Sequence, residues 1–207
     1  MVRPLVHAAG RLLLTVIYGI PAVAKLPEGQ CVVVANHNTH LDTLLLFRLF
    51  PFSKVGRVKV VAAKDHFGKG FMGWLGRRMF NLILLERHPK DAATALDPVE
   101  EALRAGDSVI LFPEGTRGEP GVLQHFKSGI GKIAAGFPDL PVYPVFIAGA
   151  ERTMPRGTAI PVPFNIRLKV MPPVLGRDFV QHGDHARKAL TQFLEEVFVR
   201  EGAAPPA

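Results

Sequence analysis

Short apolar runs rich in β-branched residues alternate along the chain with longer stretches in which apolar residues recur every three or four positions. The short runs are typical of buried strands, and the longer stretches of helices with one apolar face. This alternation predicts an α/β fold, namely a single domain with a mixed, largely helix-connected β-sheet flanked by helices. The expected strands are 31–35, 58–63, 82–85, 108–112, 142–147 and 166–171, and the expected helices are 40–50, 70–80, 91–105, 129–135 and 185–199.

The start of the chain departs from this alternation. Residues 12–24 form an uncharged apolar run that follows Arg3 and Arg11. The run is shorter than the ~20 residues that a membrane-spanning helix needs. A secretion signal would show the same basic start, with small residues at the end of the apolar run. The other alternative is a short N-terminal interfacial helix, with its apolar side in the lipid surface and its arginines among the headgroups.

Composition and charge narrow the possible functions only slightly. The 25 Lys and Arg exceed the 18 Asp and Glu by seven, and a net charge of +7 favours polyanionic partners such as nucleic acid and anionic lipid. A nucleic-acid-binding domain would be expected to show a basic stripe with interleaved aromatic residues, and the sequence has neither. The single cysteine, Cys31, cannot form an internal disulfide.

A first group of reactive side chains, residues 36–42, lies where an expected strand ends and a helix begins. If Asp42 folds back, its carboxylate can hold one ring nitrogen of His37 and leave the other to accept a proton from an alcohol. Two alternatives stay open at this point. Thr39 and Asp42 have the spacing of a helix capping box, and His37, His40 and Asp42 could ligate a metal. Five other histidines, for which no partner is identifiable and a surface or hydrogen-bonded role is expected, are His66, His88, His125, His182 and His185.

A second group, residues 112–118, also follows an apolar run. Gly115 and Gly118 allow a tight turn and a close approach of the backbone to a ligand. Arg117 can offer a planar, bidentate guanidinium to a phosphate. The alternative is an ordinary polar turn with an arginine at its rim.

Together, these segments resemble the ordered motifs of the glycerolipid (lysophosphatidate) acyltransferases. The resemblance extends over roughly residues 26–175 and includes a lysine-containing stretch at 63–67. Glu86 stands where that family more often has aspartate. The four segments that resemble the motifs, in order, are 36–42, 82–87, 112–117 and 142–147.

The resemblance implies roles for individual residues. His37 and Asp42 would be the catalytic pair, with His37 as the general base. The phosphate of the acyl acceptor would be bound by residues of the second and third motifs, and two lysines are further candidates. These substrate-binding residues are Arg87, Glu114, Gly115, Thr116 and Arg117, with Lys64 and Lys127.

The reaction implied by the resemblance moves a fatty acyl group from an acyl thioester, either acyl-CoA or acyl carrier protein, to the free hydroxyl of a lysophospholipid. The acceptor that best fits a phosphate-binding arginine is 1-acyl-sn-glycerol-3-phosphate (lysophosphatidic acid), and the product is then phosphatidic acid, a step of phospholipid biosynthesis. We expect no cofactor, no metal and no nucleic-acid partner. Three alternatives stay open: another lyso-lipid acceptor, a non-catalytic anionic-lipid-binding protein, and a hydrolase that activates water with the same pair.

A lysophospholipid lies in a bilayer, so the implied function favours an interfacial helix at the N-terminus. We therefore expect residues 1–25 to form an N-terminal membrane-interface segment, residues 26–200 the acyltransferase α/β domain and residues 201–207 a flexible tail. The protein would then act on the membrane surface at the cytoplasmic face of the cell membrane, as a peripheral or monotopic protein.

Overall fold

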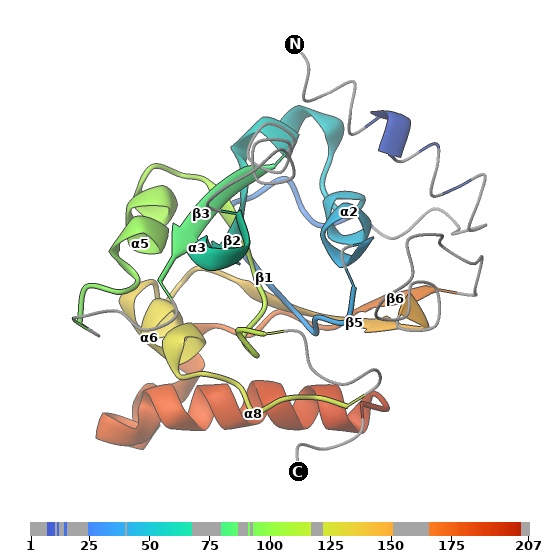
Figure 1. Ribbon diagram of the computed structural model, residues 1–207. Coiled ribbons are helices and arrows are strands. Elements are labelled where there is room, and N and C mark those ends of the chain that lie inside the picture. The colour runs from blue at the N-terminus through green and yellow to red at the C-terminus, as the bar shows by residue number, and fades with distance from the viewer. Residues whose placement is uncertain are drawn as a thin grey trace.

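A six-stranded sheet with the strand order β3-β2-β4-β1-β5-β6 forms the centre of the molecule (Figure 1). The computed structural model describes residues 8–10, 12, 15, 25–39, 41–67, 80–86, 91, 93–116, 122–150 and 166–203. Strands β1 to β5 are parallel, and β6 pairs antiparallel with β5. The predicted α/β fold with a mixed sheet is confirmed. The elements are β1 (Val32–Ala35), α2 (Leu41–Phe47), η1 (Phe52–Arg57), β2 (Val58–Ala63), α3 (Lys64–Phe67), β3 (Asn81–Leu85), α5 (Asp97–Arg104), β4 (Ser108–Leu111), α6 (Gly129–Gly136), β5 (Val142–Ala148), β6 (Arg167–Val170), η2 (Gly176–His185) and α8 (Ala186–Arg200).

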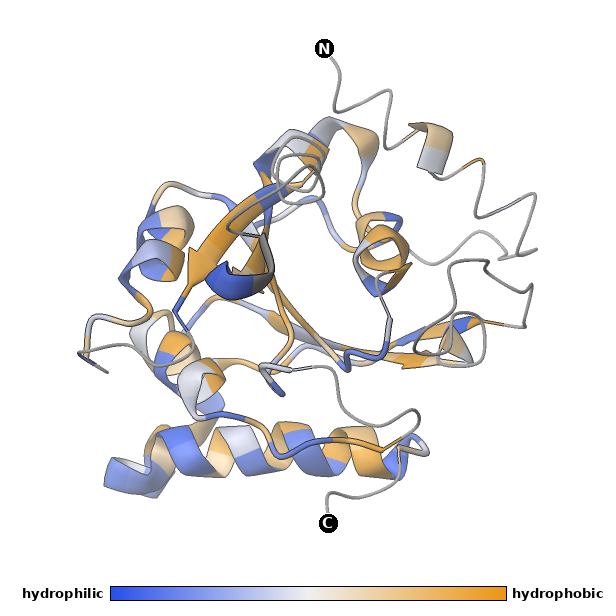
Figure 2. Cartoon of the chain, in the orientation of Figure 1, coloured by the Kyte–Doolittle hydropathy of each residue, from blue (hydrophilic) through white to orange (hydrophobic). Residues whose placement is uncertain are grey.

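The central strands β1 and β4 are buried along their whole length because helices cover both faces of the sheet. Val33 and Ala35 of β1 point into the core beneath α2, whereas Val32 and Val34 point into the core beneath α5, α6 and α8. Successive side chains of a strand alternate between its faces, so a strand covered on both sides reads as an unbroken apolar run. Figure 2 accordingly shows the central strands as mostly hydrophobic, while α8 carries both hydrophobic and hydrophilic residues.

Proline accounts for the differences between the predicted and observed helices. The helix expected at 91–105 begins only at Asp97, because Pro98 is tolerated in the first turn and not in a helix interior. The helix expected at 40–50 ends at Phe47, and Pro51 precedes the short 3-10 helix η1, which the sequence pattern did not predict. The helix expected at 70–80 lies outside the described residues, apart from Phe80.

Helices α6 and α8 pack closely through one glycine. A Cβ atom at Gly131 would lie 2.2 Å from the carbonyl oxygen of Arg187 and 2.8 Å from Oγ1 of Thr191. Only a residue without a side chain permits this approach. Helix α8 is thereby held against the face of the sheet opposite α2.

The parallel arrangement brings the two reactive segments together. β1 and β4 are neighbours, with Val34 opposite Leu111, so their carboxyl ends meet at one edge of the sheet. Residues 36–42 follow β1, and residues 112–116 follow β4. The side chain of Asn36 anchors the first segment to β5, since its amide donates to the carbonyl of Ile147 (2.9 Å) and its oxygen accepts from the Ile147 N–H (2.8 Å).

Candidate active site

A histidine and a buried carboxylate form the centre of the site. His37 lies just beyond the carboxyl end of β1, and Asp42 lies in the first turn of α2. Their side chains meet with 3.0 Å between Nδ1 of His37 and Oδ2 of Asp42. The Asp42 side chain is fully buried, whereas that of His37 is 22% exposed. The ring can therefore meet a substrate while its carboxylate partner stays shielded from water.

Asp42 organises the whole turn between β1 and α2. Besides the His37 ring, its Oδ2 atom accepts from the main-chain N–H groups of Asn38 and Thr39, each at 2.7 Å. Its Oδ1 atom accepts from the Thr39 hydroxyl at 2.8 Å. The Thr39 hydroxyl oxygen in turn accepts from the Leu41 N–H at 3.2 Å. Asp42 thus satisfies backbone donors at the start of α2, as the capping alternative expects, and also holds the imidazole.

This arrangement selects one tautomer of His37. An ionised carboxylate can only accept hydrogen bonds, so Nδ1 of His37 must carry the hydrogen that points at Asp42. In the neutral ring the lone pair then lies on Nε2. Nε2 is therefore the atom that can take a proton.

The imidazole of His37 stacks on the ring of Phe112. The ring centroids are 4.1 Å apart and the planes are inclined by 25°. Sequence analysis assigned no role to Phe112, although it directly follows β4 and opens the segment that contains Glu114. Stacking restricts rotation of the imidazole about the Cβ–Cγ bond of His37, so Phe112 and Asp42 together fix the direction of Nε2.

Glu114 connects the segment that follows β4 to the segment that follows β1. It is only 3% exposed, and its two oxygens accept from the main-chain N–H groups of His37 (2.8 Å) and Gln124 (2.9 Å). Burial raises the pKa of Glu114, although these two hydrogen bonds act in the opposite direction. Both oxygens are therefore engaged by the protein's own backbone, and Glu114 lies where it positions His37.

The ammonium group of Lys127 lies over the turn that follows Glu114. Gly115 has a φ angle of +70°, a left-handed conformation that suits glycine, and a Cβ atom at this position would lie 2.7 Å from Nζ of Lys127. The Lys127 side chain thus lies directly over the turn, and the main-chain N–H of Lys127 donates to the carbonyl of Pro113 at 3.0 Å. Thr116 is exposed beside them. The ammonium group over Gly115 and the exposed Thr116 form a surface that can receive an anion.

One further predicted residue has a definite place, and three do not. Lys64 follows β2 at the same edge of the sheet and pairs with Glu86 at 3.0 Å, both side chains being more than half exposed. Arg87 and Arg117, predicted to bind phosphate, and His40, the third ligand of the metal alternative, lie outside the described residues. Within the described ranges, no group of three or more His, Cys, Asp or Glu side chains could hold a metal ion.

The loop of residues 122–127 is tied to α8 by a carboxylate. Glu195 accepts from the Phe126 N–H at 2.8 Å, and its other oxygen lies 3.1 Å from Nδ1 of His125. Sequence analysis identified no partner for His125, and the structure gives it one because α8 packs beside this loop. These contacts with Glu195 hold the loop in place. The loop provides the Gln124 N–H that donates to Glu114 and the Lys127 side chain that lies over Gly115.

The N-terminal segment can be described only in part. Residues 8–10, 12 and 15 are helical, and Thr15 accepts a hydrogen bond from the Arg48 guanidinium at 3.1 Å. Over the described ranges, none of the helices has the length and apolar character needed to cross a membrane.

Comparison with known proteins gives consistent results. Residues 19–148 match the model of the family described as Acyltransferase, a range that contains all four motif segments. A 1-acyl-sn-glycerol-3-phosphate acyltransferase of Limnanthes douglasii is 30% identical over 175 residues, which are 81% of this chain and 59% of that protein. The enzyme of that name from Pseudomonas aeruginosa is 30% identical over 129 residues, 60% of this chain and 48% of that protein. The chain spans about half the length of the curated relatives it matches.

The fold is also similar to a solved structure. The crystal structure of the 1-acyl-sn-glycerophosphate (LPA) acyltransferase PlsC from Thermotoga maritima has a TM-score of 0.73 to this chain at 25% sequence identity. The similarity covers 97% of this chain and 78% of that one.

Proposed function

Since the chain belongs to the acyltransferase family, we propose that it moves a fatty acyl group from an acyl thioester to the free hydroxyl of a lysophospholipid. We take 1-acyl-sn-glycerol-3-phosphate as the acceptor, which makes phosphatidic acid the product. The names of the curated relatives and of the solved PlsC structure support this choice. The donor is acyl-CoA or acyl carrier protein.

The observation that carries the proposal is the contact between His37 and the buried carboxylate of Asp42. It leaves Nε2 of His37 as a partly exposed proton acceptor whose direction is fixed on two sides. A general base of this kind contributes typically about 10²–10⁴-fold to a rate. The carboxylate also stabilises the imidazolium that forms when the proton has been taken.

The proposed reaction needs no covalent intermediate on the enzyme. Nε2 of His37 removes the proton of the acceptor hydroxyl while its oxygen bonds to the thioester carbonyl carbon. The carbon–sulfur bond then breaks, and the thiolate leaves with the electron pair. A thiol has a pKa of about 8.5, so the thiolate departs readily and then takes the proton from His37.

The acceptor phosphate would bind at the turn after β4. Gly115 is half-buried and Thr116 is exposed, Lys127 lies over the turn, and Arg117 follows it directly in sequence. Arg87 and Lys64 follow β3 and β2, whose carboxyl ends lie at the same edge of the sheet. A doubly charged phosphate is held by such a set through charge-assisted hydrogen bonds.

The acceptor also implies a place for the reaction. A lysophospholipid lies in a membrane, so the site has to reach the lipid surface. We infer that residues 1–25 lie at that surface and that the protein acts at the cytoplasmic face of the cell membrane. The net charge of +7 suits a surface that contains anionic lipid.

Product analysis tests the proposal. Purified protein is supplied with acyl-CoA or acyl carrier protein and with lysophosphatidate in detergent, and thiol release is measured beside the lipid products by mass spectrometry. Equal amounts of thiol and phosphatidate are expected. Free fatty acid without new phospholipid would identify a hydrolase, product with a different lyso-lipid only would change the acceptor, and lipid binding without turnover with either donor would leave a lipid-binding protein.

The phosphate role is tested separately with Lys127→Gln. Its KM for lysophosphatidate should rise while turnover at saturation changes little, because Lys127 lies over the turn proposed to hold the phosphate and takes no part in the proton transfer. Lys188→Gln, which removes the same charge from the exposed side of α8, is the matched control. Equal KM values in the two variants would contradict the role of Lys127.

A further inference from the structure

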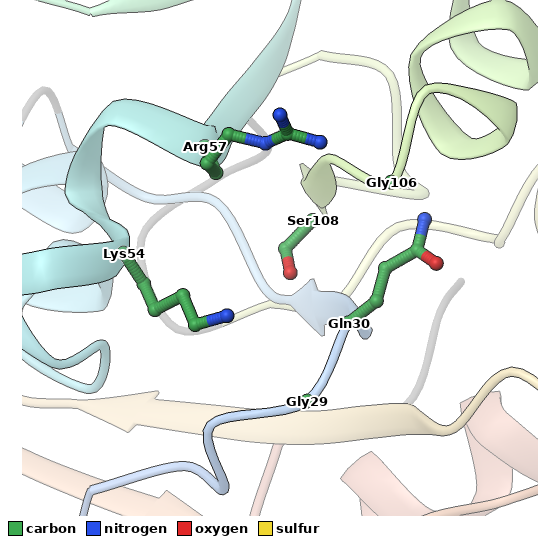
Figure 3. A pocket seen from close by; sticks show the side chains of 6 residues that line it. All are labelled: Gly29, Gln30, Lys54, Arg57, Gly106 and Ser108. Atoms are coloured by element: carbon green, nitrogen blue, oxygen red, sulfur yellow. The ribbon is translucent and has the colours of Figure 1, made fainter.

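A hollow of about 310 Å³ lies at the amino-terminal edge of the sheet (Figure 3). It is bounded by the segment before β1, the 3-10 helix η1 and the turn that leads into β4. One wall is fixed by Gln30, whose side-chain amide donates to the carbonyls of Leu103 (2.6 Å) and Asp107 (3.0 Å). Its lining residues are Gly29, Gln30, Lys54, Arg57, Gly106 and Ser108.

The hollow is positively charged because of the geometry of η1. Residues three apart in a 3-10 helix share one face, so Lys54 and Arg57 both face the hollow. Arg57 contacts Asp107 through Nε (2.8 Å) and donates to the Ala105 carbonyl, while Lys59 contacts the other oxygen of Asp107 (3.1 Å). Three cations against one carboxylate leave a local charge of +2.

Three side chains that line the hollow keep hydrogen-bond donors without a partner among the described residues. Among the described residues, Lys54 has no ion-pair partner, and Arg57 engages only its Nε and one terminal nitrogen. Ser108 is only 8% exposed, and its Oγ atom accepts from the Cys31 N–H at 3.2 Å. The same Oγ atom also accepts from the Cys31 thiol, whose sulfur lies 3.9 Å away, and among the described residues no acceptor takes the hydrogen of the Ser108 hydroxyl. A buried hydroxyl and two cations that line one hollow can donate to the oxygens of an anion.

The hollow is separate from the active site. Strands β1, β2 and β4 run parallel from the hollow toward His37, and the seven residue steps from Gln30 to His37 span about 23 Å in extended conformation. A phosphate held at the turn after β4 therefore does not fill it. Phe52, at the start of η1, is 42% exposed beside this basic face.

We propose that this hollow is a second anion site, which binds the phosphoryl group of a phosphate monoester or diester through Lys54, Arg57 and Ser108. Two negative charges on a monoester balance the local charge of +2, and the planar guanidinium suits phosphate oxygens. A volume of about 310 Å³ leaves room for an organic group beside the phosphate. The phosphoryl group can belong to a free small molecule or to a lipid headgroup, the latter being favoured by the exposed Phe52. The site is independent of the proposed acyl transfer.

Titration of the labelled full-length chain with inorganic phosphate tests the site. Amide resonances of Gly106 and Ser108 are followed by NMR in the native protein, in Lys54→Gln and in the matched charge control Lys188→Gln. The dissociation constant should rise about tenfold in Lys54→Gln, since one charge-assisted hydrogen bond is lost, and stay within about twofold in Lys188→Gln. Thermal melting checks that both variants are folded.

Co-sedimentation of the same proteins with phosphatidylglycerol or phosphatidylcholine vesicles identifies the source of the phosphoryl group. Loss of binding to phosphatidylglycerol vesicles in Lys54→Gln, but not in Lys188→Gln, assigns the site to a lipid headgroup. A selective loss of phosphate binding alone assigns it to a free phosphorylated molecule. The proposal is overturned if the amides of Gly106 and Ser108 do not respond to phosphate. It is also overturned if Lys54→Gln and Lys188→Gln weaken binding equally in both experiments.

Discussion

Replacement of Asp42 separates its structural role from its chemical one. In Asp42→Ala, the N–H groups of half-buried Asn38 and buried Thr39 lose their acceptor, and each unsatisfied group costs about 1–3 kcal/mol. The free energy of unfolding should therefore fall by about 2–6 kcal/mol. In Asp42→Asn, the amide oxygen can occupy the position of Oδ2, and the amide NH2 can donate to the Thr39 hydroxyl oxygen. That variant should lose only about 1–3 kcal/mol, because charged acceptors become neutral ones.

Turnover should respond differently from stability. Asp42→Asn keeps the Nδ1–H tautomer of His37 but no longer supplies a negative charge beside the imidazolium, so turnover should fall about 10²–10⁴-fold. Urea unfolding and thiol release are measured on the same preparations, with the exposed Asp184→Asn as the control for loss of a carboxylate. Turnover of Asp42→Asn within about threefold of the native protein would refute the chemical role. A loss of stability as large as that of Asp42→Ala would refute the hydrogen-bond assignment.

Three further predictions concern packing and buried ionisable groups. Gly131→Ala should lower the free energy of unfolding by about 1–3 kcal/mol because its Cβ meets the backbone of α8. Gly136→Ala lies in the same helix with open space around it and should be neutral or stabilising by up to about 1 kcal/mol. Equal effects of the two substitutions in urea unfolding would contradict this packing. Since burial raises the pKa of Glu114, the folded state binds this proton more tightly than the unfolded state, and the associated stability is lost as pH rises above the ordinary value of about 4.3. Stability should therefore decline with pH more steeply in the native protein than in Glu114→Gln, and parallel pH profiles would count against this. Burial raises the pKa of Cys31 to about 11, so iodoacetamide should label this cysteine only as the protein unfolds. Labelling at the rate of a free cysteine, measured by mass spectrometry, would contradict the burial of Cys31.

The centre of the sheet could be predicted because β1 and β4 are buried on both faces. A strand such as β1, with all four residues buried, gives an apolar run that needs no knowledge of its neighbours. The limits of helices were harder to predict, since Pro51 and Pro98 act through backbone constraints that an apolar periodicity does not record. The 3-10 helix η1 is too short to show a period at all.

The active site, like the fold, has local features that the sequence predicts and long-range contacts that it does not. The sequence spacing was enough to place Asp42 within reach of His37, because five residues across a strand-to-helix turn are a local matter. The stacking of Phe112 and the contact of Glu114 with the His37 N–H join residues 75 and 77 positions apart, and they depend on β1 and β4 being neighbours. Gln124 contributes only a backbone N–H, which no residue type signals in a sequence.

His37 is the residue on which the proposed chemistry depends. The most direct test compares thiol release and phosphatidate formation in His37→Ala with those of the native protein at saturating donor and acceptor. His182→Ala, which removes an exposed imidazole from η2, is the matched control. Turnover should fall at least about 100-fold in His37→Ala and stay unchanged in His182→Ala. Undiminished phosphatidate formation by folded His37→Ala would contradict the assignment of His37 as the general base.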